Sequence, residues 1–339
     1  MKGCDKVSNK IRCAVLGLGR LGYWHAGNLR YKIKDAELVV VVDPMEGRAE
    51  QVAKELEVPK WSKDADEVFA DDKIDAVVIV TPTTTHAELI KKAAINGKHI
   101  FVEKPITHTL EEADEALQMI QENQVFCQVG FMRRFDRNYV EAKRRIEAGD
   151  IGKPLYFKGI TRDGKMPPPD FIKHSGGLFL DFSIHDYDTA RFFLGAEVTT
   201  VTALGSVIDK KYVAEFHDVD QALTYLTFDS GAAADLEASR NAAYGYDIRA
   251  EIVGTDGAIQ IGSMQQHDFK ILTKQGSTHD IYPDFPSQFL DAYHLEMESF
   301  IESLLLQKKP VVDEHDGKVA LEIAIKATES YRTGKTIKW

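Results

Sequence analysis

Residues 13–22 read Cys-Ala-Val-Leu-Gly-Leu-Gly-Arg-Leu-Gly, an apolar run followed by three glycines in the pattern G-x-G-x-x-G. The apolar run predicts a strand, and the amphipathic stretch 21–32 predicts a helix directly after it. In this setting Gly17 permits a tight turn, Gly19 leaves room for a pyrophosphate, and Gly22 lets helix and strand pack closely. The pattern therefore predicts a dinucleotide-binding turn whose helix N-terminus faces the phosphates. The alternative is a glycine turn without a ligand.

Asp43 ends the next apolar strand, 21 residues after Gly22. A carboxylate here can accept from both ribose hydroxyls and repels a 2′-phosphate, so it predicts NAD rather than NADP. Arg20 and Arg48 keep NADP open as an alternative, because either cation can meet a phosphate. The residues that we expect at the cofactor are Gly17, Leu18, Gly19, Arg20, Leu21, Gly22, Asp43, Pro44, Arg48, Thr81, Pro82, Thr83, His86, Glu103 and Lys104.

The first part of the chain alternates short β-branched runs with amphipathic stretches. The predicted strands are 12–16, 38–42, 76–80, 99–102 and 126–129. The predicted helices are 21–32, 48–56, 85–96 and 110–123. Near-continuous apolar strands separated by helices are typical of a parallel sheet covered on both faces. We therefore expect an α/β, doubly wound domain over residues 1–129.

After residue 130 the pattern changes to alternating strands joined by turn signals. The predicted strands are 155–161, 198–206, 221–228, 232–239, 247–253 and 259–261, and the predicted helices are 138–148, 184–194, 293–305 and 318–330. This arrangement indicates an antiparallel meander with helices, an α+β domain over residues 130–339. Its open sheet has a face to bury, which predicts a homo-oligomer.

Composition excludes several classes of protein. The 339 residues are 44% hydrophobic and 28% charged, as in ordinary globular chains. A net charge of -11 argues against nucleic acid as a partner. Cys4, Cys13 and Cys127 lack metal-site spacing and are interpreted as reduced thiols. Residues 1–10 resemble neither a signal nor a transit segment, and we find no membrane-length apolar run, so we expect a cytoplasmic protein.

Two polar segments follow predicted strands at the edge where open α/β sheets bind ligands. The first, 81–83, together with His86, is expected beside the nicotinamide; the alternative is a polar turn with Thr85 as the helix cap. The second is Glu103-Lys104-Pro105. A lysine at a strand end is often only a solvated charge, and the glutamate and proline that flank Lys104 favour a functional role.

Residues 175–188 carry two adjacent glycines, then Asp181 and His185 four residues apart at the head of a helix. A carboxylate one helical turn from an imidazole can orient it as an acid-base pair. The alternative is a capping aspartate and a packed histidine. Asp186 and Asp188 are interpreted as ordinary solvated or capping acids.

These motifs, with Glu103-Lys104-Pro105, resemble those of the glucose-fructose oxidoreductase, inositol dehydrogenase and rhizopine-catabolism family, over the whole length of the chain. The resemblance implies a Rossmann domain followed by an α+β domain with a large, mainly antiparallel open sheet. It also implies dimers or tetramers, with a tetramer favoured. Segments 128–136 and 239–247 are similar to motifs of the inositol-oxidising members, where positions matching Arg134 and Tyr244 approach the polyol. The alternatives are an interdomain salt bridge for Arg134 and core packing for Tyr244.

Arg162 and Asp163 lie where a strand leaves the sheet, and we expect them at the substrate; the prolines at 167–169 are expected only to stiffen that loop. The full set of expected substrate contacts is Lys104, Arg134, Arg162, Asp163, Asp181, His185 and Tyr244.

The resemblance implies NAD-dependent oxidation of myo- or scyllo-inositol to a ketoinositol. In that reaction His185 takes the hydroxyl proton, Asp181 orients it, and Lys104 stabilises the alkoxide, so no metal is needed. An NAD(P)-dependent dehydrogenase of an aldose or another sugar, and a silent sugar- or cofactor-sensing protein, remain as alternatives.

Overall fold

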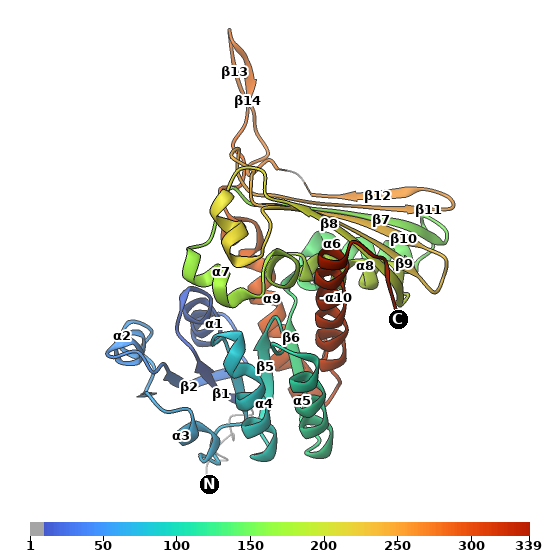
Figure 1. Ribbon diagram of the computed structural model, residues 1–339. Helices are drawn as coiled ribbons and strands as arrows, with labels where there is room; N and C mark the ends of the chain where they lie inside the picture. Colours follow the sequence, from blue (N-terminus) through green and yellow to red (C-terminus); the bar gives the residue numbers. More distant parts are fainter. Residues whose placement is uncertain (1–9, 263) are drawn as a thin grey trace. The chain divides into compact units, whose positions relative to one another are not determined.

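The computed structural model describes residues 10–262 and 264–339 (Figure 1). The chain forms two compact units: the first extends to Gly130 and also contains Tyr293–Lys318, and the second contains Phe131–Ala292 and Val319–Trp339. The predicted second domain, 130–339, differs from this division because Tyr293–Lys318 pack within the first unit. Cys4, and the first nine of the residues examined for a signal or transit segment, lie outside the described residues.

The first unit is built on a parallel sheet with the strand order β3-β2-β1-β4-β5-β6, the doubly wound arrangement expected from the sequence. The strands are β1 (Ile11–Leu16), β2 (Ala36–Val42), β3 (Lys60–Ser62), β4 (Ala76–Ile79), β5 (His99–Glu103) and β6 (Cys127–Gly130). The helices are α1 (Arg20–Tyr31), α2 (Arg48–Glu55), α3 (Asp66–Phe69), η1 (Thr83–Thr85), α4 (His86–Ile95) and α5 (Leu110–Glu122). The order reverses between β1 and β4, which places the ends of both strands at the ligand-binding edge.

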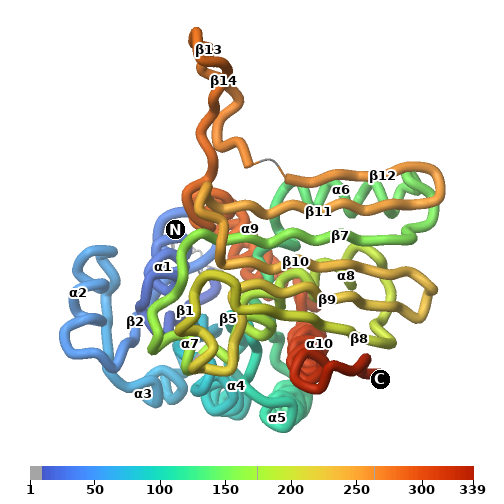
Figure 2. Tube along the Cα trace, turned by 45° about the horizontal axis from the view of Figure 1, so that its top comes forward, coloured from blue at the N-terminus to red at the C-terminus, as the bar shows by residue number. Residues whose placement is uncertain are grey.

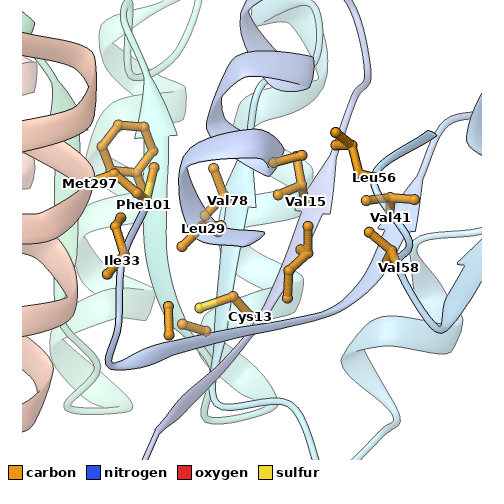
Figure 3. Close-up of a cluster of buried hydrophobic side chains, with 14 of the residues drawn as sticks. Cys13, Val15, Leu29, Ile33, Val41, Leu56, Val58, Val78, Phe101 and Met297 are labelled. Atoms are coloured by element: carbon orange, nitrogen blue, oxygen red, sulfur yellow. The ribbon is translucent and has the colours of Figure 1, made fainter. Parts of the chain in front are cut away.

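The core of this unit joins strands and helices that are distant in the sequence (Figure 3). Val15 and Val78 from the sheet and Leu29 from α1 are buried with Phe101. Met297, from helix α9 (Phe285–Leu306), is fully buried in the same cluster, as are Phe300, Ile301 and Leu304. These apolar side chains are the physical reason why Tyr293–Lys318 belong to the first unit.

The second unit contains a mixed sheet with the order β12-β11-β7-β10-β9-β8-β15 (Figure 2). The strands are β7 (Pro154–Arg162), β8 (Val198–Ser206), β9 (Gln221–Phe228), β10 (Ala233–Ser239), β11 (Asp247–Gly254), β12 (Ala258–Ile261) and β15 (Ile337–Lys338). The predicted antiparallel meander is wrong at one pairing, because β7 inserts between β10 and β11 and runs parallel to β10. The other pairings in the sheet are antiparallel.

Helices cover one face of this sheet (Figure 1). The helical segments that begin in this unit are η2 (Met132–Phe135), α6 (Arg137–Glu147), α7 (Pro169–Ser175), the π-helical turn η3 (Leu178–Phe182), α8 (Ile184–Leu194), η4 (Lys211–Phe216) and the start of α9. Helix α10 (Glu314–Thr333) ends here. Tyr187 of α8 reaches Thr224 of β9 at 3.2 Å on the covered face. Leu204 and Leu223, paired on neighbouring strands, are 63% and 43% exposed on the opposite face.

The predicted elements are found with their ends moved by one or two residues, except the last two helices, which begin earlier than expected. Several short elements were not predicted from the sequence: β3, α3, α7, η4, the hairpin of β13 (Ile271–Thr273) and β14 (Gly276–Thr278), and β15. Pro169, expected only to stiffen a loop, begins α7. Cys13 and Cys127 are free and buried. No helix in the described part of the chain is long and apolar enough to cross a membrane.

Candidate active site

The predicted phosphate-binding turn lies between β1 and α1, and each glycine meets a different local demand. Gly17 has φ +88°, and a Cβ on it would lie 2.6 Å from the carbonyl oxygen of Val80. A Cβ on Gly22 would lie 1.9 Å from the carbonyl oxygen of Gly17. Around Gly19, in contrast, there is open space. The turn therefore leaves room on the side where a pyrophosphate approaches.

Asp43 follows β2 and connects it to the turn. Its Oδ2 accepts from the Leu18 amide at 2.7 Å and its Oδ1 accepts from the Met45 amide at 2.9 Å. Each oxygen retains a lone pair for a ribose hydroxyl. Arg48 donates to the Leu18 carbonyl at 2.8 Å, which engages it with the turn, whereas Arg20 is exposed. These residues fit a dinucleotide, because Gly19 is open and α1 begins without a side-chain cap.

The polar segment after β4 is tied to the backbone around it. Thr85 donates to the Thr81 hydroxyl at 2.7 Å and does not cap α4. His86 is 1% exposed, and its ring nitrogens lie 2.9 Å from the Pro105 carbonyl and 3.0 Å from the Thr81 carbonyl. Burial lowers the pKa of His86. The imidazole thus joins two loops, while Pro82 is exposed and Thr83 half-buried beside it.

Lys104 directly follows the buried end of β5 and is itself half-buried. The peptide bond to Pro105 is cis. Glu103 was expected to contact the cofactor, but its carboxylate is buried and lies 2.9 Å from Nε2 of His25. Leu21 is half-buried and Pro44 exposed, close in sequence to the turn and to Asp43. Lys104 is therefore the more exposed of the two ionic side chains of its segment.

In the second unit, Asp181 and His185 lie on either side of a break in the helix. Asp181 belongs to the π-helical turn η3, and α8 begins after Ser183. The single α-helix expected for this pair is therefore interrupted. His185 is 9% exposed and packs edge-on against the ring of Phe131, with 5.9 Å between ring centroids.

Arg240 holds Asp181, a contact that the sequence analysis missed. Its Nη2 donates to Oδ2 of Asp181 at 3.0 Å, and its guanidinium lies over the ring of Phe182. Arg240 follows β10 directly, and the Asp163 amide, after the parallel strand β7, donates to the carbonyl of Ser239. Burial raises the pKa of Asp163, opposed by the Lys165 amide and the charge of Arg240. The sequence feature that could have indicated this contact is a basic residue, Arg240, directly after a predicted strand.

Arg134 is engaged in a salt bridge, but the pair lies within the second unit and is not the interdomain bridge considered for it. Its guanidinium binds the Asp188 carboxylate with two hydrogen bonds, of 2.9 and 2.6 Å. Arg133 donates from Nη1 to Oδ1 of Asp186 at 2.6 Å and from Nη2 to the Thr161 hydroxyl at 3.0 Å. The interpretation of Asp186 and Asp188 as solvated or capping acids is wrong, because they are 2% and 1% exposed. Two buried ion pairs therefore connect η2 to α8.

Arg162 and Tyr244 lie together, with Nη1 of Arg162 donating to the Tyr244 hydroxyl at 3.2 Å. Arg162 pairs with Glu237 at 2.6 Å, and Tyr244 donates to Asp247 at 2.8 Å. Arg162 lies on the uncovered face of the sheet, together with Glu237 and Lys158. Thr161 lies on the covered face, where its hydroxyl donates to Asp186 of α8. Tyr244 is 47% exposed, so core packing is wrong for it. Of the neighbouring residues Arg162 and Asp163, Asp163 is thus the one that lies near Arg240.

Comparisons with known proteins agree with this architecture. Residues 11–131 match the model of an oxidoreductase family with an NAD-binding Rossmann fold, and residues 143–339 match the C-terminal alpha/beta domain of the same family. The chain is 55% identical to a protein of Bacillus subtilis named scyllo-inositol 2-dehydrogenase (NAD(+)), over 98% of this chain and 97% of the relative.

Two further relatives match along nearly their whole length. Myo-inositol 2-dehydrogenase of Thermotoga maritima is 38% identical, over 97% of this chain and 98% of the relative. The crystal structure of a scyllo-inositol dehydrogenase from Lactobacillus casei, with bound NAD(H) and scyllo-inositol, superposes with a TM-score of 0.92 at 31% identity. It covers 97% of this chain and 99% of that one.

Proposed function

The chain belongs to the glucose-fructose oxidoreductase, inositol dehydrogenase and rhizopine-catabolism family, and on this premise we propose that it oxidises a cyclic polyol, scyllo- or myo-inositol, to a ketoinositol with NAD. The observation that carries the proposal is the 55% identity to a named scyllo-inositol 2-dehydrogenase over almost the full length of both proteins. For the same reason we place scyllo-inositol first among the substrates.

The cofactor assignment has its own support in the first unit. Asp43 presents a carboxylate that is already positioned by the amides of Leu18 and Met45. This negative charge repels a 2′-phosphate, and Arg48 is engaged with the turn. The arrangement favours NAD over NADP. The nicotinamide, when bound, accepts the hydride from the carbinol carbon.

The proton chemistry is assigned to three side chains of this protein. His185 takes the hydroxyl proton as general base, because a neutral imidazole is a good proton acceptor near neutral pH. Asp181, steadied by Arg240, orients the imidazole and stabilises its charged form. Lys104 places a positive charge at the alkoxide oxygen. Asp163 and Arg240 are the best-supported additional contacts for the polyol hydroxyls, because both lie at the strand ends near Asp181.

We also infer a homo-oligomer, with a tetramer favoured over a dimer, and a cytoplasmic location. Support for the oligomer comes from the uncovered face of the seven-stranded sheet. Leu204, Leu223, Tyr225 and Val253 are each at least 36% exposed there. A second copy would bury this apolar surface.

A nicotinamide absorbance assay with purified protein tests the proposal. We expect reduction of NAD with scyllo-inositol and myo-inositol, and little with glucose or with NADP in place of NAD. A preference for glucose would favour the alternative that the protein is an aldose dehydrogenase. NAD binding without turnover on any polyol would identify a sensing protein instead.

A further inference from the structure

A buried group of three titratable side chains in the first unit includes Glu103, the residue directly before Lys104. His25 of α1 and Glu296 of α9 are 0% exposed, and Glu103 of β5 is 6% exposed. Nε2 of His25 lies 2.9 Å from Oε1 of Glu103 and 3.9 Å from Oε1 of Glu296. The rings of Phe101 and Tyr293 border the imidazole, with centroids 5.2 and 5.9 Å away. Water is therefore excluded from three groups that can each carry a charge.

The surroundings indicate how charge is distributed in this cluster. Glu103 has a hydrogen-bond partner in His25, whereas neither carboxyl oxygen of Glu296 has one among the described residues. Two carboxylates beside one imidazole in a dry core would leave a negative charge unpaired, which is costly. Burial, and then the nearby Glu103, raise the pKa of Glu296 well above its ordinary value. Glu296, which is fully buried and has no hydrogen-bond partner among the described residues, is therefore the member expected to be neutral.

The position of Glu103 connects this cluster to Lys104. In the register of the sheet Glu103 lies opposite Gly130 of β6, where a Cβ would stand 2.9 Å from the Glu103 carboxylate. The missing side chain makes room for the carboxylate. On the other side of Lys104, the carbonyl of Pro105 is bound by the buried His86. Both neighbours of Lys104 are thus held by a buried histidine.

We propose that Glu103 is a positioning residue: its buried side chain, hydrogen-bonded to His25 and close to the buried Glu296, holds the end of β5 from which Lys104 reaches the reacting oxygen. The inference rests on the proposed function for the role of Lys104. The state of the cluster does not depend on any substrate.

The first experiment compares thermal unfolding of wild type and Glu296→Gln as a function of pH. Gln imitates the protonated acid. A carboxyl group with a raised native pKa stabilises the fold below its unfolded value, about 4.3, and loses that contribution as pH rises. We expect equal melting temperatures at acidic pH, and a wild type that becomes progressively less stable than Glu296→Gln above it. The titratable groups that face Glu296 are His25 from α1, Glu103 from β5 and, on its own helix, Tyr293.

The opposite trend, with Glu296→Gln less stable near neutral pH, would mean that Glu296 is ionised and would overturn the assignment. One tightly bound divalent metal per chain in purified wild type would do the same, since the three side chains also have the spacing of metal ligands.

The second experiment follows Lys104 in Glu103→Gln. We expect turnover to fall by about 10- to 100-fold with NAD affinity nearly unchanged, because a small displacement of a catalytic group is enough for such a loss. Glu122→Gln, at an exposed position of α5, serves as the matched control. His25→Gln, which keeps an N–H donor for Glu103, should recover part of the turnover lost in His25→Leu.

A third experiment measures the chemical reactivity of Lys104 and needs no substrate. Trace acetylation followed by peptide mapping gives the reactivity of Lys104 relative to the exposed Lys54. We expect Glu103→Gln to change this ratio and Glu122→Gln to leave it unchanged. An unchanged ratio would overturn the positioning role even if the wild type oxidises no polyol. Absence of turnover in the wild type would refute only the proposed function.

Discussion

Asp43 illustrates how one side chain combines a structural and a recognition role. It accepts from the Leu18 amide of the phosphate turn, and in our proposal its carboxylate also decides between the two nicotinamide cofactors. We predict that Asp43→Ser moves the preference toward NADP by about 1 to 3 kcal/mol, because the ribose acceptor and the repulsion of a 2′-phosphate are both lost. The ratio of kcat/KM for NAD and NADP measures it, with Asp35→Ser, at an exposed position before β2, as control. A wild type that already prefers NADP would contradict the argument.

His185, Lys104 and Asp181 are predicted to fail in different ways. His185→Ala should lower turnover by about 10² to 10⁴ with NAD binding nearly intact, since its role is to accept a proton. Lys104→Ala should lose both turnover and polyol affinity, because the ammonium meets the oxygen in the ground state too. Asp181→Asn should lower turnover and move the acid limb of the pH-rate profile to lower pH. Steady-state kinetics with NAD titrations test all three, and normal turnover in His185→Ala would refute the base assignment.

Arg133 and Arg134 show what residue patterns alone leave open. From the sequence alone, Asp186 and Asp188 are interpreted as solvated or capping acids because charged side chains are seldom buried without a partner. Their partners lie more than 50 residues earlier in the chain, so only the tertiary structure reveals the pairs. Arg162 is different. It lies in phase with Lys158, and period-2 alternation along β7 already indicates that Arg162 and Asp163 point to opposite faces.

At the scale of elements, two buried ion pairs fix α8, the helix that begins beside Asp181 and carries His185, to η2. We predict that Arg134→Leu lowers the free energy of unfolding by about 3 to 5 kcal/mol, since it leaves Asp188 buried without its partner. Arg134→Leu combined with Asp188→Leu should recover much of that loss. Urea unfolding of both variants, with Arg144→Leu at an exposed helix position as control, measures the difference. Equal losses in the single and double variants would show that the pair does not act as a unit.

The strands and helices themselves were largely predictable, because their apolar periodicity is local. The insertion of β7 between β10 and β11 was not, since a parallel pairing leaves no turn signal in the sequence. The short elements α3 and η4 were missed for a related reason: each has too few residues to show a period. At the candidate site, motifs predicted Asp181 and His185, but the contact of Arg240 with Asp181 emerged only from the fold.

At the scale of the whole molecule, the uncovered sheet face makes a prediction about assembly. Light scattering at low protein concentration should find a tetramer, or a dimer at least, because paired Leu204 and Leu223 leave apolar surface in solvent. Leu204→Glu with Leu223→Glu should dissociate it, while Leu272→Glu, on the separate β13–β14 hairpin, should not. A wild type that stays monomeric would refute the assignment of this face.

Because Tyr293–Lys318 pack in the first unit, the core of that unit can be completed only late in translation. When Gly130 has left the ribosome, every strand of the parallel sheet is present, yet the places of Met297, Phe300, Ile301 and Leu304 in its core are still vacant. About 170 more residues must be translated before they arrive, which takes roughly 10 to 35 s at ordinary elongation rates. Through that interval the nascent first unit exposes apolar surface that a chaperone can recognise. The nucleotide-binding unit is therefore completed only near the end of synthesis.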